Sequence, residues 1–496
     1  MNRAYTLDNL RAGEVFDLLV IGGGATGLGV AVDAAARGYT VALLERGDFA
    51  GGTSSRSTKL VHGGVRYLRQ GDLKLVRTAL LERGRLARNA PHLVRDLDFV
   101  IPAYGLTDRT FYGLGLKLYD TLAGPLSLGP SLMLSRAETM EHLLNIEPAG
   151  LRGGVLYHDA QFDDARLAVT LALTATDHGA VLLNHAEVLE FAREGDRITG
   201  VLARDRIGGG GLMVHARQVV NATGIFVDGL RAIEDPAARP SVSVSQGAHL
   251  VLPRRFLPGA SALMVPKTDD GRVLFAIPWR DRVLVGTTDT ARPGPDSEPR
   301  ALVEECAFLL EHARRYLADD PAPEDVLSVF AGQRPLVRGE PKAETKSLSR
   351  DHSISVGPGG LLTVTGGKWT TYRLMAEEVV DLAARLAGLP PKPCPTADLP
   401  LRASIPIRPG SEILHPSLPY FEAEVRRAAR EEAAQTVEDV LSRRTRCLLL
   451  DAHAASACAP RVAAILAEEF GRNEAWVAAQ VRSFQALAAT YAFPEG

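Results

Sequence analysis

Cysteine is scarce in this chain, which has four among 496 residues. None of them are spaced as Cys-x-x-Cys, so a disulfide framework and a structural zinc site are both disfavoured, and a reducing compartment fits the pattern. Aromatic residues make up only 6% of the chain, but its 46% hydrophobic and 23% charged residues are ordinary for a globular protein. This composition excludes disordered and fibrous proteins. No cluster of His, Cys and Asp has the spacing of metal ligands, so no metal site is expected.

The chain also lacks an excess of either charge and a long hydrophobic run. Lys and Arg total 56 against 59 Asp and Glu, which gives a net charge of −3. Proteins dedicated to nucleic acids are normally strongly basic, so no nucleic-acid partner is expected. No run free of charged residues reaches the roughly 20 residues of a transmembrane helix. The apolar stretch Leu18–Val32 is interrupted by glycines and lacks the basic start of a signal peptide. We therefore expect a cytoplasmic protein.

The order of hydrophobic patterns predicts an α/β protein. After a short tail over residues 1–14, buried-strand patterns at 16–21 and 40–45 flank a helical stretch at 29–37. A β-α-β unit of this size requires a parallel sheet and a right-handed crossover. Further helices are expected over 72–90, 164–178 and 301–317, strands over 181–191, 197–205, 212–224, 241–252, 261–266, 272–278 and 283–289, and a strand, glycine turn and helix over 361–388.

The first β-α-β unit carries a dinucleotide fingerprint. Gly22, Gly24 and Gly27 form Gly-x-Gly-x-x-Gly between a strand and a helix. In this motif the first glycine permits the tight turn, the second lets the backbone approach a pyrophosphate, and the third allows close packing of helix and strand. Glu45 ends the second strand, where a carboxylate accepts hydrogen bonds from ribose hydroxyls. An acidic residue there favours FAD or NAD over NADP.

Three further markers favour FAD over NAD. The long Gly/Ser-rich loop over 51–68 offers polar backbone to a flavin chain and ring, with Thr53, Ser54 and Ser55 as candidate contacts. Ala222-Thr223-Gly224 ends a hydrophobic strand where the chain can pass close to the cofactor. Thr365-Gly366-Gly367-Lys368 opens a helix, whose positive end would stabilise the charge of reduced flavin.

These motifs resemble the FAD-dependent, quinone-linked glycerol-3-phosphate dehydrogenases, over nearly the whole chain. The most specific stretch is TSSRSTKLVHGGVRYL at 53–68. The resemblance implies oxidation of sn-glycerol 3-phosphate to dihydroxyacetone phosphate, with hydride transfer to flavin N5 and electrons passed to a respiratory quinone. The supporting segments are DDARL at 163–167, VNATG at 220–224, GAHLVLP at 247–253, FAIPWRDRVLVGTTD at 275–289, GQRPL at 332–336, TGGKWTTYR at 365–373 and VEDVLSRRTR at 437–446.

The patterns and the resemblance together predict a fold of three parts. They are an FAD-binding Rossmann-like parallel sheet built from discontinuous segments, an antiparallel-sheet substrate (cap) domain, and a C-terminal helical domain that follows a proline-rich linker. The predicted bounds are 15–75, 150–240 and 325–388 for the FAD-binding domain, 76–149 and 241–324 for the cap domain, 389–410 for the linker and 411–496 for the helical domain.

Cations are the first candidates for the substrate site. A phosphate dianion requires convergent cations, and arginine suits bidentate contact. Arg66, Arg334 and Lys368 coincide with the family motifs, so we expect them near the substrate. Tyr67 is a candidate contact through its hydroxyl. The neighbours Gln333 and Trp369 depart from the family pattern, and are expected to alter the shape of the pocket rather than its chemistry.

The reaction also needs a base for the substrate's hydroxyl proton, and histidine suits that task near neutral pH. His62 lies in the His-Gly-Gly turn and His249 in GAHLVLP. Either histidine could be the base, and either could instead be structural. The sequence does not decide between them.

Three alternative functions stay open. An oxidase would act on the same substrate but pass electrons to oxygen. Another flavoenzyme of the amine- and hydroxy-acid-oxidising group would use Arg334 to bind a carboxylate. A flavin-bound sensor without turnover would bind FAD but leave it oxidised in the presence of any phosphorylated polyol.

A quinone acceptor lies in the bilayer, so the enzyme must reach the membrane surface. The region from Tyr104 to Leu134 mixes Leu, Phe and Tyr with Arg109 and Lys117, as an interfacial element does; a buried segment of the cap domain is the competing interpretation. We expect peripheral association with the inner face of the cell membrane. The resemblance alone raises the option of a homodimer.

Overall fold

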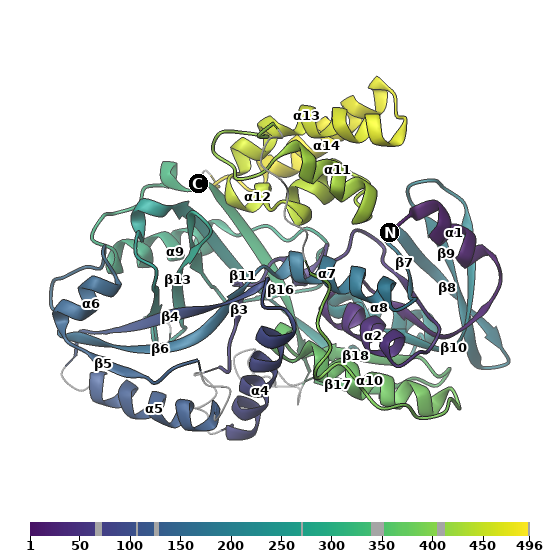
Figure 1. Ribbon diagram of the computed structural model, residues 1–496, viewed down its shortest axis with the longest axis horizontal. Helices are drawn as coiled ribbons and strands as arrows, with labels where there is room; N and C mark the ends of the chain where they lie inside the picture. Colours follow the sequence, from purple (N-terminus) through teal and green to yellow (C-terminus); the bar gives the residue numbers. More distant parts are fainter. Residues whose placement is uncertain are drawn as a thin grey trace.

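The computed structural model describes residues 1–64, 72–105, 108–123, 128–268, 271–338, 352–403 and 412–494. Within these ranges the chain forms two sheets side by side, with a group of C-terminal helices lying over both (Figure 1). The candidate arginine Arg66 and its neighbour Tyr67 lie outside the described residues.

The first sheet has a core of parallel strands. Strand β1 pairs with β2 on one side and β10 on the other, and β18 continues the sheet beyond β10, all in parallel. This is the sheet that the β-α-β unit predicts. The eight strands found among the described residues are β17 (His352–Val356), β18 (Leu362–Gly366), β10 (Gly211–Asn221), β1 (Val15–Ile21), β2 (Val41–Leu44) and β7 (Val181–Leu183) in spatial order, with β9 (Arg197–Asp205) on β10 and β8 (Ala186–Glu194) on β9.

Two layers cover this sheet. Leu18 and Val20 of β1 face one hydrophobic core, while Leu19 and Ile21 face another, as the two-residue period of a strand requires. The first core contains the helices α2 (Ala25–Ala36), α7 (Asp164–Asp177) and α10 (Tyr372–Leu386), and the second contains α1 (Arg3–Arg11) and the hairpin β8–β9.

Two local predictions were wrong. The expected tail is the helix α1, which Asn2 caps by accepting the backbone N–H of Tyr5. Its sequence is polar, and packing of Leu10 against the sheet supplies a stability that the local pattern does not show. The single strand expected over 181–191 is two strands, β7 and β8, because His185 takes a positive φ of 52° between them.

The second sheet is mostly antiparallel, and its only parallel pair among the described strands is β12 with β4. Three of its strands, β3, β6 and β16, come from segments that the sequence assigned to the FAD-binding domain. The chain therefore crosses between the two sheets more often than we predicted. The strands are β15 (Thr290–Arg292), β11 (Val242–Pro253), β14 (Arg282–Gly286), β13 (Leu274–Trp279), β12 (Ala262–Val265), β4 (Val94–Ala103), β6 (Gly153–Phe162) and β3 (Leu60–Val61), with β16 (Ser328–Val337) on β11 and β5 (Leu132–Leu134) on β6.

Helices pack on both faces of this sheet. On one face α9 (Val303–Tyr316) buries Cys306 and Leu309 against Leu250 and Leu252 of β11. On the other, α4 (Leu73–Asn89) and α5 (Asp108–Ala123) bury Leu80 and Tyr119 in a core that is shared with the C-terminal helices. The short helix α6 (Arg136–His142) contacts β4, β5 and β6 of this sheet, whereas α8 (Val227–Glu234) contacts β8 and β18 of the first sheet.

The C-terminal part is helical, as predicted. Residues 389–403 of the proline-rich segment contain no helix or strand. Within the helical domain predicted over 411–496, Gly471 ends one long helix with a positive φ of 62° before the last helix begins. The elements are α11 (Glu422–Glu431), a π-helix η8 (Asp439–Arg444), α12 (Cys447–Leu450), α13 (Ala452–Phe470) and α14 (Glu474–Ala489).

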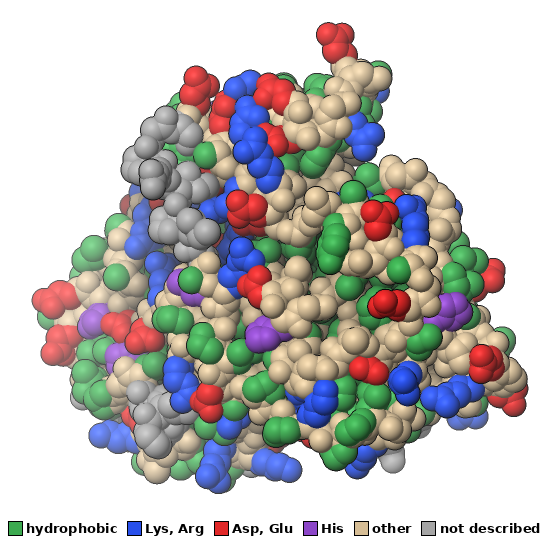
Figure 2. Space-filling view, turned by 45° about the vertical axis from the view of Figure 1, so that its right-hand side comes forward, with side chains coloured by type: hydrophobic (Ala, Val, Ile, Leu, Met, Phe, Trp, Pro, Cys, Tyr) green, Lys and Arg blue, Asp and Glu red, His purple; other side chains and the backbone are tan. Residues whose placement is uncertain are grey.

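None of the helices that the structure describes is both long and apolar enough to span a bilayer. On the face shown in Figure 2, acidic and basic side chains are interspersed over the described surface. This mixture agrees with the small net charge of −3.

Candidate active site

A groove of about 1260 Å³ runs along the carboxyl ends of β1, β10 and β18. Ligands of open α/β sheets bind at this edge. Most of the predicted cofactor residues line it, although Gly27 and Ser55 do not. The predicted residues that line it are Gly22, Gly24, Glu45, Thr53, Ser54, Ala222, Thr223, Gly224, Gly366, Gly367 and Lys368.

Two glycines allow helix α2 to begin close to the end of β1. Gly22 has a φ of 110°, and a Cβ there would lie 2.6 Å from the carbonyl oxygen of Ala222. A Cβ on Gly27 would lie 1.9 Å from the carbonyl oxygen of Gly22. Gly27 therefore has a packing role beneath the groove, which explains why it does not line it.

The first turn of α2 faces the groove. Gly24 precedes the helix, and a Cβ there would lie 3.1 Å from Oγ of Ser54. The backbone N–H of Ala25 donates to the same Oγ at 2.9 Å. The free N–H groups and the positive end of a helix favour a phosphate at this position.

Glu45 lies where a ribose-binding carboxylate is expected. Its oxygens accept hydrogen bonds from the backbone N–H groups of Gly23, at 2.6 Å, and Gly47, at 2.7 Å. These bonds fix the carboxylate, and each oxygen keeps a further lone pair for a ligand hydroxyl. Burial raises the pKa of Glu45.

The far end of the groove is formed by the turn after β18. Gly366 and Gly367 have φ values of 79° and 76°, and Lys368 then precedes a short 3₁₀ turn, η7 (Trp369–Thr371), and α10. Trp369, one of the departures from the family pattern, donates its indole N–H to the carbonyl of Ser54 at 2.9 Å. It therefore ties the turn to the Gly/Ser-rich loop.

These features fit a bound dinucleotide. The groove offers a helix N-terminus, a fixed carboxylate and a wall free of side chains at Gly22 and Gly24. In addition, the buried Oγ1 of Thr365, which lines the groove, has no hydrogen-bond partner within the described residues. An orphaned buried hydroxyl is costly, and a ligand atom would satisfy it.

A second cavity of about 170 Å³ lies in the cap sheet. Its size suits a small substrate, because pockets for drug-sized molecules hold roughly 300–1,000 Å³. Arg334 and Pro335, which are consecutive in β16, line the small pocket and the groove respectively. The polar and charged residues of the pocket are Thr58, His62, Asp159, Arg272, Thr287, Thr288, Asp289 and Arg334, and its apolar side chains are Leu60, Phe99, Tyr157, Met264, Val273 and Phe275.

Arg334 is held from the turn after β14. Its Nη2 donates to Oγ1 of Thr287 at 3.1 Å and to the carbonyl of Thr288 at 3.3 Å, and its Nη1 lies 3.6 Å from Oδ1 of Asp289. A Cβ on Gly247 would lie 2.3 Å from Nη2. The glycine therefore leaves the space that the guanidinium occupies.

The two candidate histidines differ in position. His62 lines the pocket. His249 is buried, stacks on Phe330 with ring centroids 4.7 Å apart, and its Nε2 lies 3.0 Å from Oγ1 of Thr58. Burial, reinforced by the nearby cations Lys59 and Arg334, holds the pKa of His249 well below its usual range. His249 is therefore neutral at physiological pH.

The structure separates some predicted neighbours. Lys368 lines the groove and not the small pocket, whereas Arg334 and His62 share that pocket. Sequence reasoning missed Thr58 and Arg272 as pocket residues. Thr58 falls inside the motif at 53–68, so it could have been found there, but nothing in the local pattern marks Arg272 among the many arginines of the chain.

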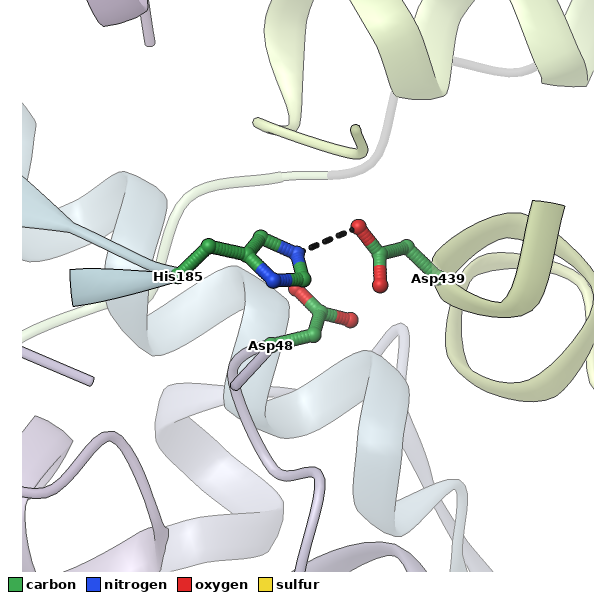
Figure 3. A group of neighbouring side chains, drawn as sticks. All are labelled: Asp48, His185 and Asp439. Carbon is green, nitrogen blue, oxygen red and sulfur yellow. Dashed lines mark hydrogen bonds and ion pairs between the residues drawn. The ribbon is translucent and has the colours of Figure 1, made fainter. Parts of the chain in front are cut away.

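Three side chains at the other end of the groove have the composition of a metal site. Asp48, His185 and Asp439 place one ligand atom each within 4.8 Å of one another (Figure 3). However, Arg443 and Arg444 already bind these carboxylates: Arg443 donates to both Asp48 and Asp439, and Arg444 donates to Asp48. The arginines supply the positive charge that a cation would bring.

Comparison with known proteins gives the family. The sequence model described as "FAD dependent oxidoreductase" matches residues 17–381, and that of the "C-terminal domain of alpha-glycerophosphate oxidase" matches residues 400–477. A probable mitochondrial glycerol-3-phosphate dehydrogenase of Caenorhabditis elegans is 38% identical, over 97% of this chain and 74% of its own. The corresponding enzyme of Arabidopsis thaliana is 39% identical, over 92% and 83%.

The chain belongs to the FAD-dependent glycerol-3-phosphate dehydrogenase family. Among solved structures, the glycerol-3-phosphate dehydrogenase from Bacillus halodurans complexed with FAD superposes with a TM-score of 0.77 and 28% identity, over 99% of this chain and 97% of that one. An L-alpha-glycerophosphate oxidase from Mycoplasma pneumoniae with FAD bound shares the fold, with a TM-score of 0.62 and 19% identity over 80% of this chain and all of its own. The predictions of family, FAD cofactor and three-part α/β architecture are confirmed.

The Gly24→Val variant of this protein should purify without bound FAD. The added side chain would project beside Ser54 into the path of the pyrophosphate. The measurement is the visible absorbance of oxidised flavin per protein chain. The matched control is Gly115→Val in α5, where a Cβ meets no atom within 4 Å. A Gly24→Val variant that stays fully loaded would overturn the placement of the pyrophosphate.

Proposed function

We propose that this protein oxidises sn-glycerol 3-phosphate to dihydroxyacetone phosphate and passes the electrons to a respiratory quinone. The proposal is supported chiefly by the position of Arg334. This residue of β16 lines the small pocket, and the next residue of the strand, Pro335, lines the cofactor groove. The relatives named above carry the same activity in their names.

The pocket suits a small phosphorylated alcohol. Arg334 lines it and provides positive charge for a phosphate dianion. The apolar side chains of Phe99, Tyr157 and Met264 form the rest of the wall and exclude water from the carbon chain. When bound, FAD supplies the acceptor for the hydride that leaves C2.

His62 is the residue that we propose takes the hydroxyl proton of the substrate. It lines the pocket directly, so a ring nitrogen can reach the hydroxyl at C2. His249 contacts Thr58 instead, and we propose that His249 positions the hydroxyl of Thr58 at the pocket wall. The removal of a hydride and a proton leaves the carbonyl of dihydroxyacetone phosphate.

Lys368, Arg66 and Tyr67 keep the roles that the sequence suggested, as proposals. Lys368 precedes the turn before α10 and supplies positive charge at the far end of the groove. Arg66 and Tyr67 follow the His-Gly-Gly turn. We retain the predicted domain bounds as proposals too, apart from the strands β3, β6 and β16.

A peripheral contact with the inner face of the cell membrane would bring the enzyme to its quinone. Helix α5 exposes Leu114 and Leu118, which lie one turn apart, with 76% and 45% of their surfaces accessible. A Cβ on Gly113 would lie 2.4 Å from Sδ of Met133, so the exposed Met133 of β5 extends the same apolar area. This area lies on the side of the molecule opposite the C-terminal helices (Figure 1).

The first test is anaerobic mixing of the purified holoenzyme with sn-glycerol 3-phosphate. The visible flavin absorbance should bleach, and a soluble quinone should restore it quickly while oxygen restores it slowly. Fast recovery with oxygen would indicate the oxidase instead. Absence of bleaching would contradict the substrate and leave an amine or hydroxy-acid oxidoreductase, or a sensor.

The Arg334→Leu variant should keep FAD, but its kcat/KM should fall about a hundredfold. The reason is that a charged contact to both the substrate and the transition state is lost from a small pocket. Arg334→Lys should recover part of the loss. Arg255→Leu, which removes an exposed arginine beside Asp325, is the control. Unchanged activity in Arg334→Leu would contradict the assignment.

Leu114→Asp combined with Leu118→Asp should abolish co-sedimentation with vesicles of phosphatidylethanolamine and phosphatidylglycerol, because a charge on the buried face of an interfacial helix opposes insertion. Leu189→Asp in β8, also an exposed leucine, is the control. Recovery of the unaltered protein wholly in the supernatant at low salt would refute the membrane contact.

A further inference from the structure

The motif VEDVLSRRTR at 437–446 belongs to the C-terminal helical domain, yet three of its arginines point into the cofactor-binding part of the molecule. Arg443, Arg444 and Arg446 are at most 5% exposed. Their hydrogen-bond partners outside the C-terminal domain lie in the segment that follows Glu45 or at the start of helix α7. We call these three residues the arginine clamp.

Two of the clamp arginines bind Asp48, in the turn that follows Glu45. Arg443 donates through Nε at 2.5 Å, and Arg444 donates through Nη1 and Nη2 at 2.6 and 2.8 Å. Asp48 is 2% exposed, and Asn184 Nδ2 is a further donor to it, at 3.0 Å. Every hydrogen bond to this carboxylate that the structure records thus comes from outside its own loop.

The third arginine of the clamp acts at the other end of the same loop. Arg446 donates to the carbonyl of Ser55 at 2.7 Å and to Asp164 at 3.1 Å. Lys59 donates to the same two groups, at 2.8 and 2.7 Å. The clamp therefore holds both Asp48 and Ser55, on either side of Thr53 and Ser54, which line the groove.

The C-terminal domain also forms part of the groove wall itself. His185 and Asp439 meet there, with Nε2 and Oδ2 2.9 Å apart (Figure 3). Although burial alone would raise the pKa of Asp439, His185 and Arg443 hold it below its usual range, so the carboxylate is ionised. The residues of this domain that line the groove include Thr436, Asp439, Arg443 and Phe484.

We propose that the arginine clamp of the C-terminal domain slows the release of FAD. Arg443, Arg444 and Arg446 act as positioning residues, which hold residues 46–59 in the conformation that binds the cofactor. The inference rests on the cofactor groove and not on the identity of the substrate. If the protein failed to oxidise sn-glycerol 3-phosphate, the clamp would still be expected to retain FAD.

The first test is the rate of FAD release from the purified holoenzyme, followed by the rise in flavin fluorescence after dilution. Asp48→Asn and Arg444→Met should each speed release by about tenfold or more, because each removes charged hydrogen bonds that hold the loop. The double variant should release FAD about as fast as the faster single variant, because the two residues share one interaction.

The control for release is Arg430→Met. Arg430 pairs with Glu469 in the same domain but on its surface, away from the groove. Its release rate should stay at the wild-type value. If Asp48→Asn and Arg444→Met lowered the melting temperature but released FAD at the wild-type rate, the clamp would be a structural contact only, and the proposal would fail.

Two further measurements test the proposal even if the Arg444→Met variant does not fold. Arg444→Lys retains the charge but cannot make the two parallel bonds, so its release rate should lie between those of wild type and Asp48→Asn. In the unaltered protein, removal of FAD should increase hydrogen exchange in residues 432–446 as well as in 46–59, since coupling between two sites is reciprocal. A change confined to 46–59 would overturn the proposal.

Discussion

The burial of Asp48 and Asp164 is the constraint on which the cofactor site depends. A carboxylate taken out of water costs several kcal/mol unless cations and hydrogen-bond donors surround it. Asp164 is fully buried and accepts from Ser57, Lys59 and Arg446, and Asp48 accepts from two further arginines. The C-terminal domain therefore supplies most of the positive charge that stabilises the loop between Glu45 and Lys59.

This dependence links two parts of the chain that are about 280 to 400 residues apart in sequence. Lys59 shows how closely the charges are balanced. Its ammonium group is fully buried, and burial lowers its pKa to about 7 even though it is bonded to Asp164. A single cation is thus a weak partner for Asp164, and the guanidinium of Arg446 supplies a second hydrogen-bonded cation at 3.1 Å. The motif at 437–446 is thus in direct contact with the loop that lines the cofactor groove.

The sequence predicted those parts of the fold that have a local cause. The turn at Gly22, the helix after it and the strand ending at Glu45 follow from hydrophobic period and glycine spacing, and the structure has them within a few residues. The helix at residues 3–11 and the break at His185 were missed because tertiary contacts decide them. In the site, Arg334 and His62 were found through motifs, and the structure places them in one pocket. The partners of Asp48 were not found, since no local pattern tells which of many arginines reaches a given carboxylate.

The arrangement of pocket and groove follows from the two-residue period of a strand. Arg334 and Pro335 point to opposite faces of β16, so one strand lines both the small pocket and the cofactor groove. A slip of one residue would exchange the two side chains and put a proline where the guanidinium must be. Pairing with β11 along the whole length of β16, from Val337 opposite Val242 to Ser328 opposite Val251, prevents such a slip. Under the proposed function, the alignment of substrate with cofactor is therefore set by sheet register.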